Sequence, residues 1–149
     1  MLNSFSVVGS GVRFYSEDTR FVLRNKRKVS AWVAGVVSEE KQATCNLTYI
    51  FCSDSYLLDL NRRFLDHDTL TDIITFPDAD DPVRVSGDIF ISVDRVRENA
   101  EKFGDSFEGE LARVIVHGAL HLLGYKDKTL KDRALMRERE DRYLLNRFD

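Results

Sequence analysis

The chain has 149 residues, of which 43% are hydrophobic and 32% are charged. This composition is typical of one folded domain and excludes a disordered chain, so we expect a single domain over residues 1–149. The 22 basic and 25 acidic residues leave a net charge of −3, which excludes a protein that coats nucleic acid through an overall basic excess. The longest apolar run, residues 31–37, is too short to span a membrane, and no signal peptide is visible. We therefore expect a cytoplasmic protein with no membrane partner.

The first half of the chain predicts two strands and two helices. Residues 4–8 are consistent with a short strand, and the apolar spacing of residues 19–39 predicts a helix. Residues 44–51 alternate and are rich in β-formers, which predicts a strand with Cys45, Leu47, Tyr49 and Phe51 on one face. Ser53 is a good N-cap for a short helix that reaches residue 64.

The second half predicts two further strands, over residues 71–76 and 85–92, and then only helices. A polar helix over residues 93–103 ends at a glycine, and a capping box at residues 105–108 opens the next helix. A last, highly charged helix begins near Thr129 and ends near residue 146. Strands early and helices late predict an α+β fold, with a mixed sheet of about four strands packed against about five helices.

Two of the three histidines, His117 and His121, lie four residues apart in the fourth predicted helix. At this spacing two imidazoles project from one helix face and can bind one metal ion, as in the HExxH helix of zinc proteases. The alternative is a metal-free pair, because the flanking residues are apolar. The bulk-free Gly118 beside the first histidine favours the metal site, which we expect on this central helix and the loop after it.

The segment after the histidine helix provides a candidate third ligand. Gly124 ends the helix and lets the chain turn back, and Asp127 follows His121 by six residues. Three protein ligands with one open position are typical of a catalytic zinc site. However, Gly118 stands where an HExxH protease carries its glutamate base, so peptide hydrolysis loses most of its support.

The sequence HGALHLLGY at residues 117–125 resembles the signature of the YbeY family of bacterial endoribonucleases, which are rRNA maturation factors. Three upstream segments agree with this family in order and spacing: Leu-Asn at residues 60–61, TDIITFP at 71–77 and Gly-Asp-Ile at 87–89. The resemblance covers about residues 44–145.

The resemblance implies a cytoplasmic, metal-dependent enzyme that cleaves single-stranded RNA in ribosomal RNA processing and ribosome quality control. It also implies that His117, His121 and a third residue after the Gly-Tyr turn form the catalytic metal site and hold one Zn²⁺ per chain. The third residue, commonly histidine in the family, is here Asp127. A carboxylate is a normal zinc ligand, but it is harder than imidazole, so another divalent metal is also compatible with this site.

The candidate RNA-binding residues lie in three places. The family usually has a functionally important arginine four residues after the asparagine of its Leu-Asn segment, and that position is Leu65 here. Its role is therefore not transferred, although two neighbouring arginines are within reach of RNA phosphates. Further candidates belong to matched family positions or flank Asp127, and for each of them an ordinary surface or turn role is the alternative. The full set is Arg62, Arg63, Thr71, Asp72, Lys126 and Lys128.

We therefore expect a zinc-dependent endoribonuclease whose partners are single-stranded RNA, the ribosome or ribosomal proteins. The absent arginine at Leu65 keeps a second hypothesis open, a non-catalytic ribosome-assembly factor that binds RNA and holds a structural zinc. A metallohydrolase of other substrates is the third hypothesis, and Gly118 weakens it.

Overall fold

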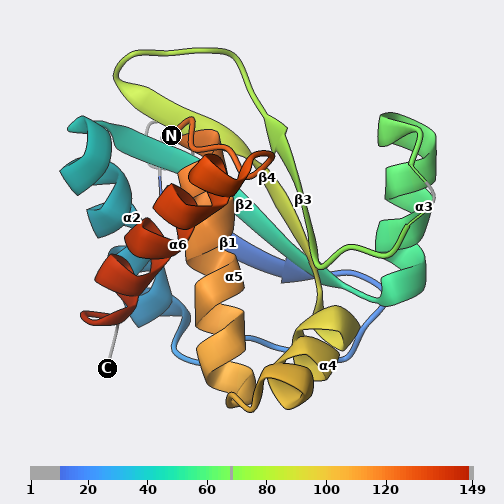
Figure 1. Cartoon of the computed structure of the whole chain (residues 1–149). Helices are drawn as coiled ribbons and strands as arrows, with labels where there is room; N and C mark the ends of the chain where they lie inside the picture. The colour runs from blue at the N-terminus through green and yellow to red at the C-terminus, as the bar shows by residue number, and fades with distance from the viewer. Residues whose placement is uncertain (1–10, 68, 148–149) are drawn as a thin grey trace.

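The computed structural model describes residues 11–67 and 69–147 (Figure 1). Its strands are β1 (Gly11–Ser16), β2 (Thr44–Cys52), β3 (Ile73–Pro77) and β4 (Arg84–Ser92). They form one sheet in the order β1-β2-β4-β3. The strands β1, β2 and β4 run parallel to one another, and β3 lies antiparallel to β4 at the edge. The structure thus confirms the predicted mixed sheet.

The helices are α2 (Lys26–Lys41), α3 (Asp54–Leu65), α4 (Val93–Phe103), α5 (Phe107–Leu122) and α6 (Leu130–Leu144). Helix α5 contacts α2, α4 and α6 as well as β3 and β4, and Figure 1 shows it standing among these helices in front of the sheet. Helix α3 packs on the other face of the sheet. This arrangement confirms the predicted α+β class. Within the described ranges, no helix is both long enough and apolar enough to cross a membrane.

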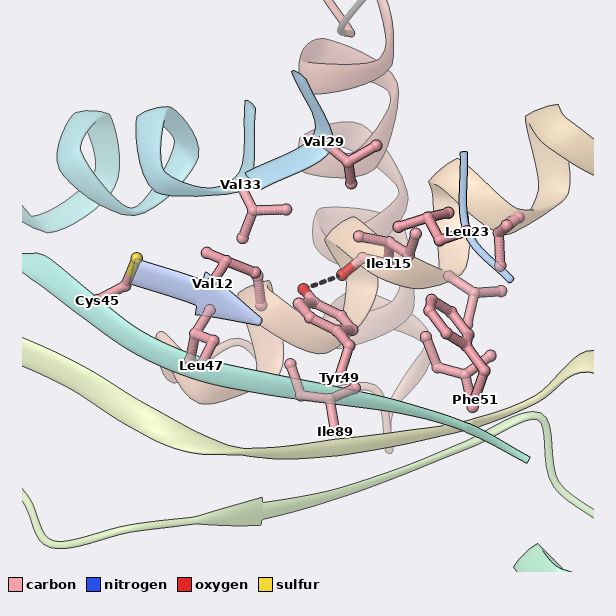
Figure 2. Close-up of a cluster of buried hydrophobic side chains, with 14 of the residues drawn as sticks. Val12, Leu23, Val29, Val33, Cys45, Leu47, Tyr49, Phe51, Ile89 and Ile115 are labelled. Atoms are coloured by element: carbon pink, nitrogen blue, oxygen red, sulfur yellow. Dashed lines mark hydrogen bonds between the residues drawn. The ribbon is translucent and has the colours of Figure 1, made fainter. Parts of the chain in front are cut away.

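The main core lies between the sheet and the helices α2 and α5 (Figure 2). Cys45, Leu47, Tyr49 and Phe51 all point into this core, as their alternation in the sequence predicts. The hydroxyl of Tyr49 donates a 2.7 Å hydrogen bond to the main-chain oxygen of Ile115, shown by the dashed line in Figure 2. This bond fixes the middle of α5 over β2 and so positions the end of the helix that carries His117 and His121.

Two predicted helix starts were wrong, one strand was not predicted, and one predicted strand lies outside the described residues. The predicted helix over residues 19–39 begins only at Lys26, because Asn25 adopts a left-handed conformation (φ 58°) that cannot continue a helix. Helix α5 is capped by Ser106, whose hydroxyl accepts the N–H of Gly109, and not by the residue before it. The structure places β1 at residues 11–16, a strand that the sequence analysis missed. The strand predicted at residues 4–8 lies outside the described residues.

Candidate metal centre

Local sequence brings the two histidines and the aspartate together. His117 and His121 lie one turn apart in α5, with ring centroids separated by 4.6 Å. After the helix, the N–H of Gly124 donates to the carbonyl of His121 and the N–H of Tyr125 donates to the carbonyl of Leu120. This pair of bonds is a Schellman motif, and the positive φ of Gly124 (106°) permits it. The motif reverses the chain so that the following residues return to the histidine face.

The returning segment places Asp127 beside both imidazoles. Its Oδ2 lies 3.1 Å from Nε2 of His121 and 3.4 Å from Nε2 of His117. One donor atom from each of these three residues lies within 4.8 Å of the other two. Two imidazole nitrogens and one carboxylate oxygen form the donor set expected for a catalytic zinc site with an open position. The residues therefore fit a divalent metal ion.

Contacts on the far side of each ring determine which nitrogen faces the site. Nδ1 of His117 lies 2.6 Å from Oε2 of Glu140, a carboxylate on α6. Nδ1 of His121 lies 3.0 Å from the carbonyl oxygen of Tyr125. Because both of these oxygens are hydrogen-bond acceptors, each Nδ1 carries the hydrogen that it donates and each Nε2 keeps a free lone pair for a metal.

Glu140 is only 5% exposed, and it forms an ion pair with Arg113 in addition to its contact with His117. The guanidinium of Arg113 donates to Oε1 of Glu140 at 2.8 Å and to Oδ1 of Asp141 at 2.9 Å. Burial lowers the pKa of His117, but the bonded Glu140 and the nearby carboxylates outweigh this effect and raise it overall. The surroundings of His117 thus favour positive charge, whether it comes from a proton or from a metal ion.

Gly118 has a different role from the one that its position beside His117 indicated. A Cβ at this position would lie 2.8 Å from Cγ2 of Ile89 and 2.9 Å from Cδ1 of Ile73. The glycine therefore faces the sheet, and it allows α5 to approach β3 and β4 closely. A glutamate at this position, as in HExxH proteases, would collide with both isoleucines. The protease hypothesis thus fails on space as well as on the missing base.

The three donors lie in a cleft of about 700 Å³ between α3, α4, α5, α6 and the segment before β3. Its wall includes Asp72, whose carboxyl pKa is raised by burial against the opposing pull of His117. Asn61, the asparagine of the Leu-Asn segment, is buried, and its side-chain amide donates a 2.8 Å hydrogen bond to the carbonyl of Thr69. This bond holds the loop that leads to Asp72. The cleft therefore joins three of the four family-like segments at the metal centre.

The structure brings only some of the candidate RNA-binding residues to this cleft. Thr71 and Asp72 belong to its lining. Arg62, Arg63, Lys126 and Lys128 are exposed and are not part of the lining, and Arg63 forms a 3.1 Å ion pair with Asp59. The role of all six in RNA binding stays a prediction. Leu65 does line the cleft, at the position where the family resemblance indicates an arginine.

Sequence reasoning missed four charged residues that α5 and α6 add to the cleft. Glu110 and Arg113 precede His117 by seven and four residues, and so lie on the same face of α5. Arg137 and Glu140 come from the last helix, which the sequence presents as uniformly charged. The periodicity of α5 could have indicated the first pair. No local signal identifies the second pair, because only the packing of α6 on α5 brings it to the site.

A family model described as Endoribonuclease YbeY matches residues 14–148 of this chain. A protein named Endoribonuclease YbeY from Cytophaga hutchinsonii is 49% identical over 128 residues, covering 86% of this chain and 90% of that protein. A protein of the same name from Flavobacterium psychrophilum is 45% identical over 130 residues, and the match covers 87% of this chain and 92% of that protein. The solution structure of TM1509 from Thermotoga maritima aligns with a TM-score of 0.62 at 28% identity, covering 89% of this chain and 86% of that one.

Proposed function

Because this chain belongs to the YbeY endoribonuclease family, we propose that it cleaves single-stranded ribosomal RNA at the centre formed by His117, His121 and Asp127. The observation that carries the proposal is the meeting of these three donors in one open cleft. We propose further that residues 1–149 act as one catalytic domain. Its place of action would be the cytoplasm, with the ribosome or ribosomal proteins as partners.

We propose that His117, His121 and Asp127 hold one Zn²⁺ per chain, with another divalent metal as the alternative. Such an ion supplies Lewis-acid polarisation of a phosphate and lowers the pKa of a bound water. The protein residues do the remaining work. Glu140 and the Tyr125 carbonyl keep the Nδ1 protons in place and orient both rings, so that the open side of the site faces the cleft.

The rim of the cleft supports a single-stranded substrate. Leu65, Leu70 and Phe103 line the cleft and are 42%, 52% and 64% exposed. An exposed aromatic ring offers a stacking surface to an unpaired base, whereas the bases of a duplex are already stacked on each other. A flexible strand can also lower one phosphate into the cleft, which a rigid duplex cannot do as easily. This rim therefore favours unpaired RNA.

Cleavage of an unstructured RNA by metal-loaded, metal-free and reconstituted protein tests the proposal. The metal-free protein should stay folded, because a chain of this size buries enough apolar surface without a metal, and it should not cleave. Added Zn²⁺ or Mn²⁺ should restore cleavage to wild-type protein but not to His117→Ala. Circular dichroism on each sample separates loss of folding from loss of chemistry. Cleavage by folded, metal-free protein would contradict the metal mechanism, and no cleavage by any form would support the assembly-factor hypothesis.

A further inference from the structure

Two arginines line the cleft, and only one of them is already bonded to carboxylates. Arg113 uses both ends of its guanidinium, one on Glu140 and one on Asp141. Arg137 is exposed and has neither an ion pair nor a hydrogen bond within residues 11–67 and 69–147. Its guanidinium is therefore the one in the cleft wall that can bind a ligand without first giving up a protein partner.

The position of Arg137 on α6 places it next to the metal-binding face. It precedes Glu140 by three residues, so the two side chains project from neighbouring positions on one side of the helix. Glu140 contacts His117 at 2.6 Å, and Met136 and Tyr143 are buried and pack α6 against the rest of the fold. Arg137 therefore lies on a helix that packing holds in place, in the wall of the cleft that contains the three donors.

The charge of the cleft explains why a phosphate needs such a residue. Within residues 11–67 and 69–147, four carboxylates line the cleft, those of Asp72, Glu110, Asp127 and Glu140, against two guanidinium groups. Burial and the neighbouring Asp72 raise the pKa of Glu110, whereas Arg113 and, to a smaller extent, Arg137 lower it, so both guanidinium groups act on this carboxyl of the cleft. An RNA phosphate that approaches the metal centre must pass these carboxylates, and an unpaired guanidinium offsets their repulsion.

We propose that Arg137 binds a phosphate of the RNA substrate beside the metal centre through two parallel N–H···O hydrogen bonds. This inference deepens the proposed function and rests on it. Guanidinium geometry matches two oxygens of one phosphate, which positions the backbone as well as attracting it. Leu65, which stands in α3 where the family usually has an arginine, lies in the wall of the same cleft. Arg137 of α6 would therefore provide the cation that α3 lacks.

The test compares Arg137→Met, which removes the charge but keeps a long side chain, with the matched control Arg27→Met on α2. Arg27 is exposed and lies outside the cleft lining. The measured quantities are kcat/KM on an unstructured RNA, and the salt dependence of binding to a 2′-O-methyl single strand that is checked for integrity afterwards. Metal content and Tm are measured on every variant.

Arg137→Met should lower kcat/KM by about 10- to 100-fold, the effect of losing a charge-assisted hydrogen-bonded pair. It should also reduce the log–log salt slope of binding by about 0.7, the value for one phosphate contact on a single strand. Metal content and Tm should be unchanged, and Arg27→Met should match wild type in kcat/KM. Arg137→Lys should recover the slope but only part of kcat/KM, because an ammonium group does not bind two oxygens in a fixed geometry.

A second variant keeps the test decisive. Leu65→Arg combined with Arg137→Met returns a guanidinium to the cleft from α3, so its kcat/KM should exceed that of Arg137→Met alone. Wild-type kinetics and an unchanged salt slope in Arg137→Met would overturn the inference. So would a loss of metal or of Tm that Leu65→Arg does not repair, because the residue would then be structural. If wild-type protein binds RNA without cleaving it, the proposed function fails, while the salt slope still decides the phosphate contact.

Discussion

Oε2 of Glu140 lies 2.6 Å from Nδ1 of His117, across the packed helices α5 and α6. This contact connects the last helix of the chain to the metal centre. The same carboxylate accepts a hydrogen bond from Arg113, so one buried group satisfies both His117 and a partly buried guanidinium. Such partners on the far side of ligand histidines orient the ring and strengthen its basicity.

Glu140→Gln should therefore weaken metal binding and folding together. A neutral amide cannot accept from His117 and Arg113 as a carboxylate does. We expect metal affinity to fall about 10- to 100-fold and the free energy of unfolding to fall by about 1–3 kcal/mol. Chelator competition and urea denaturation measure these changes. Glu138→Gln, an exposed change on the same helix, is the control. Equal metal affinity in the two variants would show that Glu140 does not support the centre.

Gly118→Ala should destabilise the protein because α5 packs too closely on the sheet to accept a methyl group. The new Cβ would lie 2.8 Å and 2.9 Å from Ile89 and Ile73. Overpacking of this kind costs about 1–3 kcal/mol. Gly35→Ala is the control, since an added Cβ there meets no atom within 4 Å. This control should gain about 0.5–1 kcal/mol of stability from helix propensity. Thermal denaturation gives the Tm of both variants. If the two Tm values moved in the same direction, α5 would not be packed too closely on the sheet for a methyl group at position 118.

Much of the architecture follows from local patterns in the sequence. The alternation of Cys45 to Phe51 assigned β2 and its buried face correctly. The i, i+4 histidines with Gly124 and Asp127 indicated three side chains that the structure does bring together. These patterns are reliable because strand burial, helix spacing and the Schellman turn are determined by residues close together in sequence.

The features that sequence reasoning missed depend on contacts between distant segments. The start of α2 was misplaced because Leu23 is buried in a loop, so its apolar character imitated a helical position. Glu140 and Arg137 were missed because α6 carries charges on all its faces, and only its packing on α5 distinguishes inward from outward charges. Likewise, the role of Gly118 depends on Ile73 and Ile89 in another layer of the fold.

The buried thiol of Cys52 predicts a loss of stability in alkali. Burial raises its pKa from 9.0 to about 12, with nearby carboxylates adding to the shift. Above pH 9 the unfolded chain therefore releases a proton that the folded chain keeps, and the free energy of unfolding falls as pH rises. Below pH 9 both states are protonated and the effect disappears. Between the two pKa values, the contribution of Cys52 to the free energy of unfolding falls by up to about 1.4 kcal/mol per pH unit.

Urea denaturation of wild type and Cys52→Ala between pH 7 and pH 10.5 isolates this contribution. The variant loses some packing, but that cost does not depend on pH. The difference in stability between the two proteins should therefore stay constant up to about pH 9 and then change in favour of the variant. A constant difference over the whole range would mean that the thiol of Cys52 ionises equally in the folded and unfolded states.

Phe103→Ala should weaken binding of single-stranded RNA while leaving the fold intact. The ring is 64% exposed at the cleft rim, so truncation removes little buried area. Loss of a base-stacking surface costs about 1–3 kcal/mol of binding free energy. Fluorescence anisotropy with a single strand and with a duplex measures the effect, which should be larger for the single strand. Val83→Ala, at a site that is 67% exposed and outside the cleft lining, is the control. Equal effects on the two RNAs would exclude stacking.

Asp127→His should change which metal the protein prefers. Oδ2 of Asp127 lies 3.1 Å and 3.4 Å from the two Nε2 atoms, so an imidazole there joins an existing pair. A carboxylate is a hard ligand that suits Mn²⁺, whereas imidazole suits Zn²⁺. The ratio of Zn²⁺ to Mn²⁺ affinity should therefore rise about tenfold or more, which corresponds to about 1.4 kcal/mol. Competition against a chromophoric chelator measures both affinities. Lys126→His, which adds a histidine in the same turn without replacing a donor, is the control.

Substitution of His121 or Asp127 by alanine removes one donor at a time and compares how strongly each holds the metal. His121→Ala should lose metal more completely than Asp127→Ala, because a water can take the place of a carboxylate oxygen more easily than that of an imidazole fixed by α5. Asp127 is 42% exposed and His121 is 22% exposed, so water already has better access to the aspartate position. Elemental analysis after dialysis gives the metal content of each variant. Equal and complete loss in both would mean that Asp127 is as essential as the helix histidines, and an unchanged metal preference in Asp127→His would mean that it is not a ligand at all.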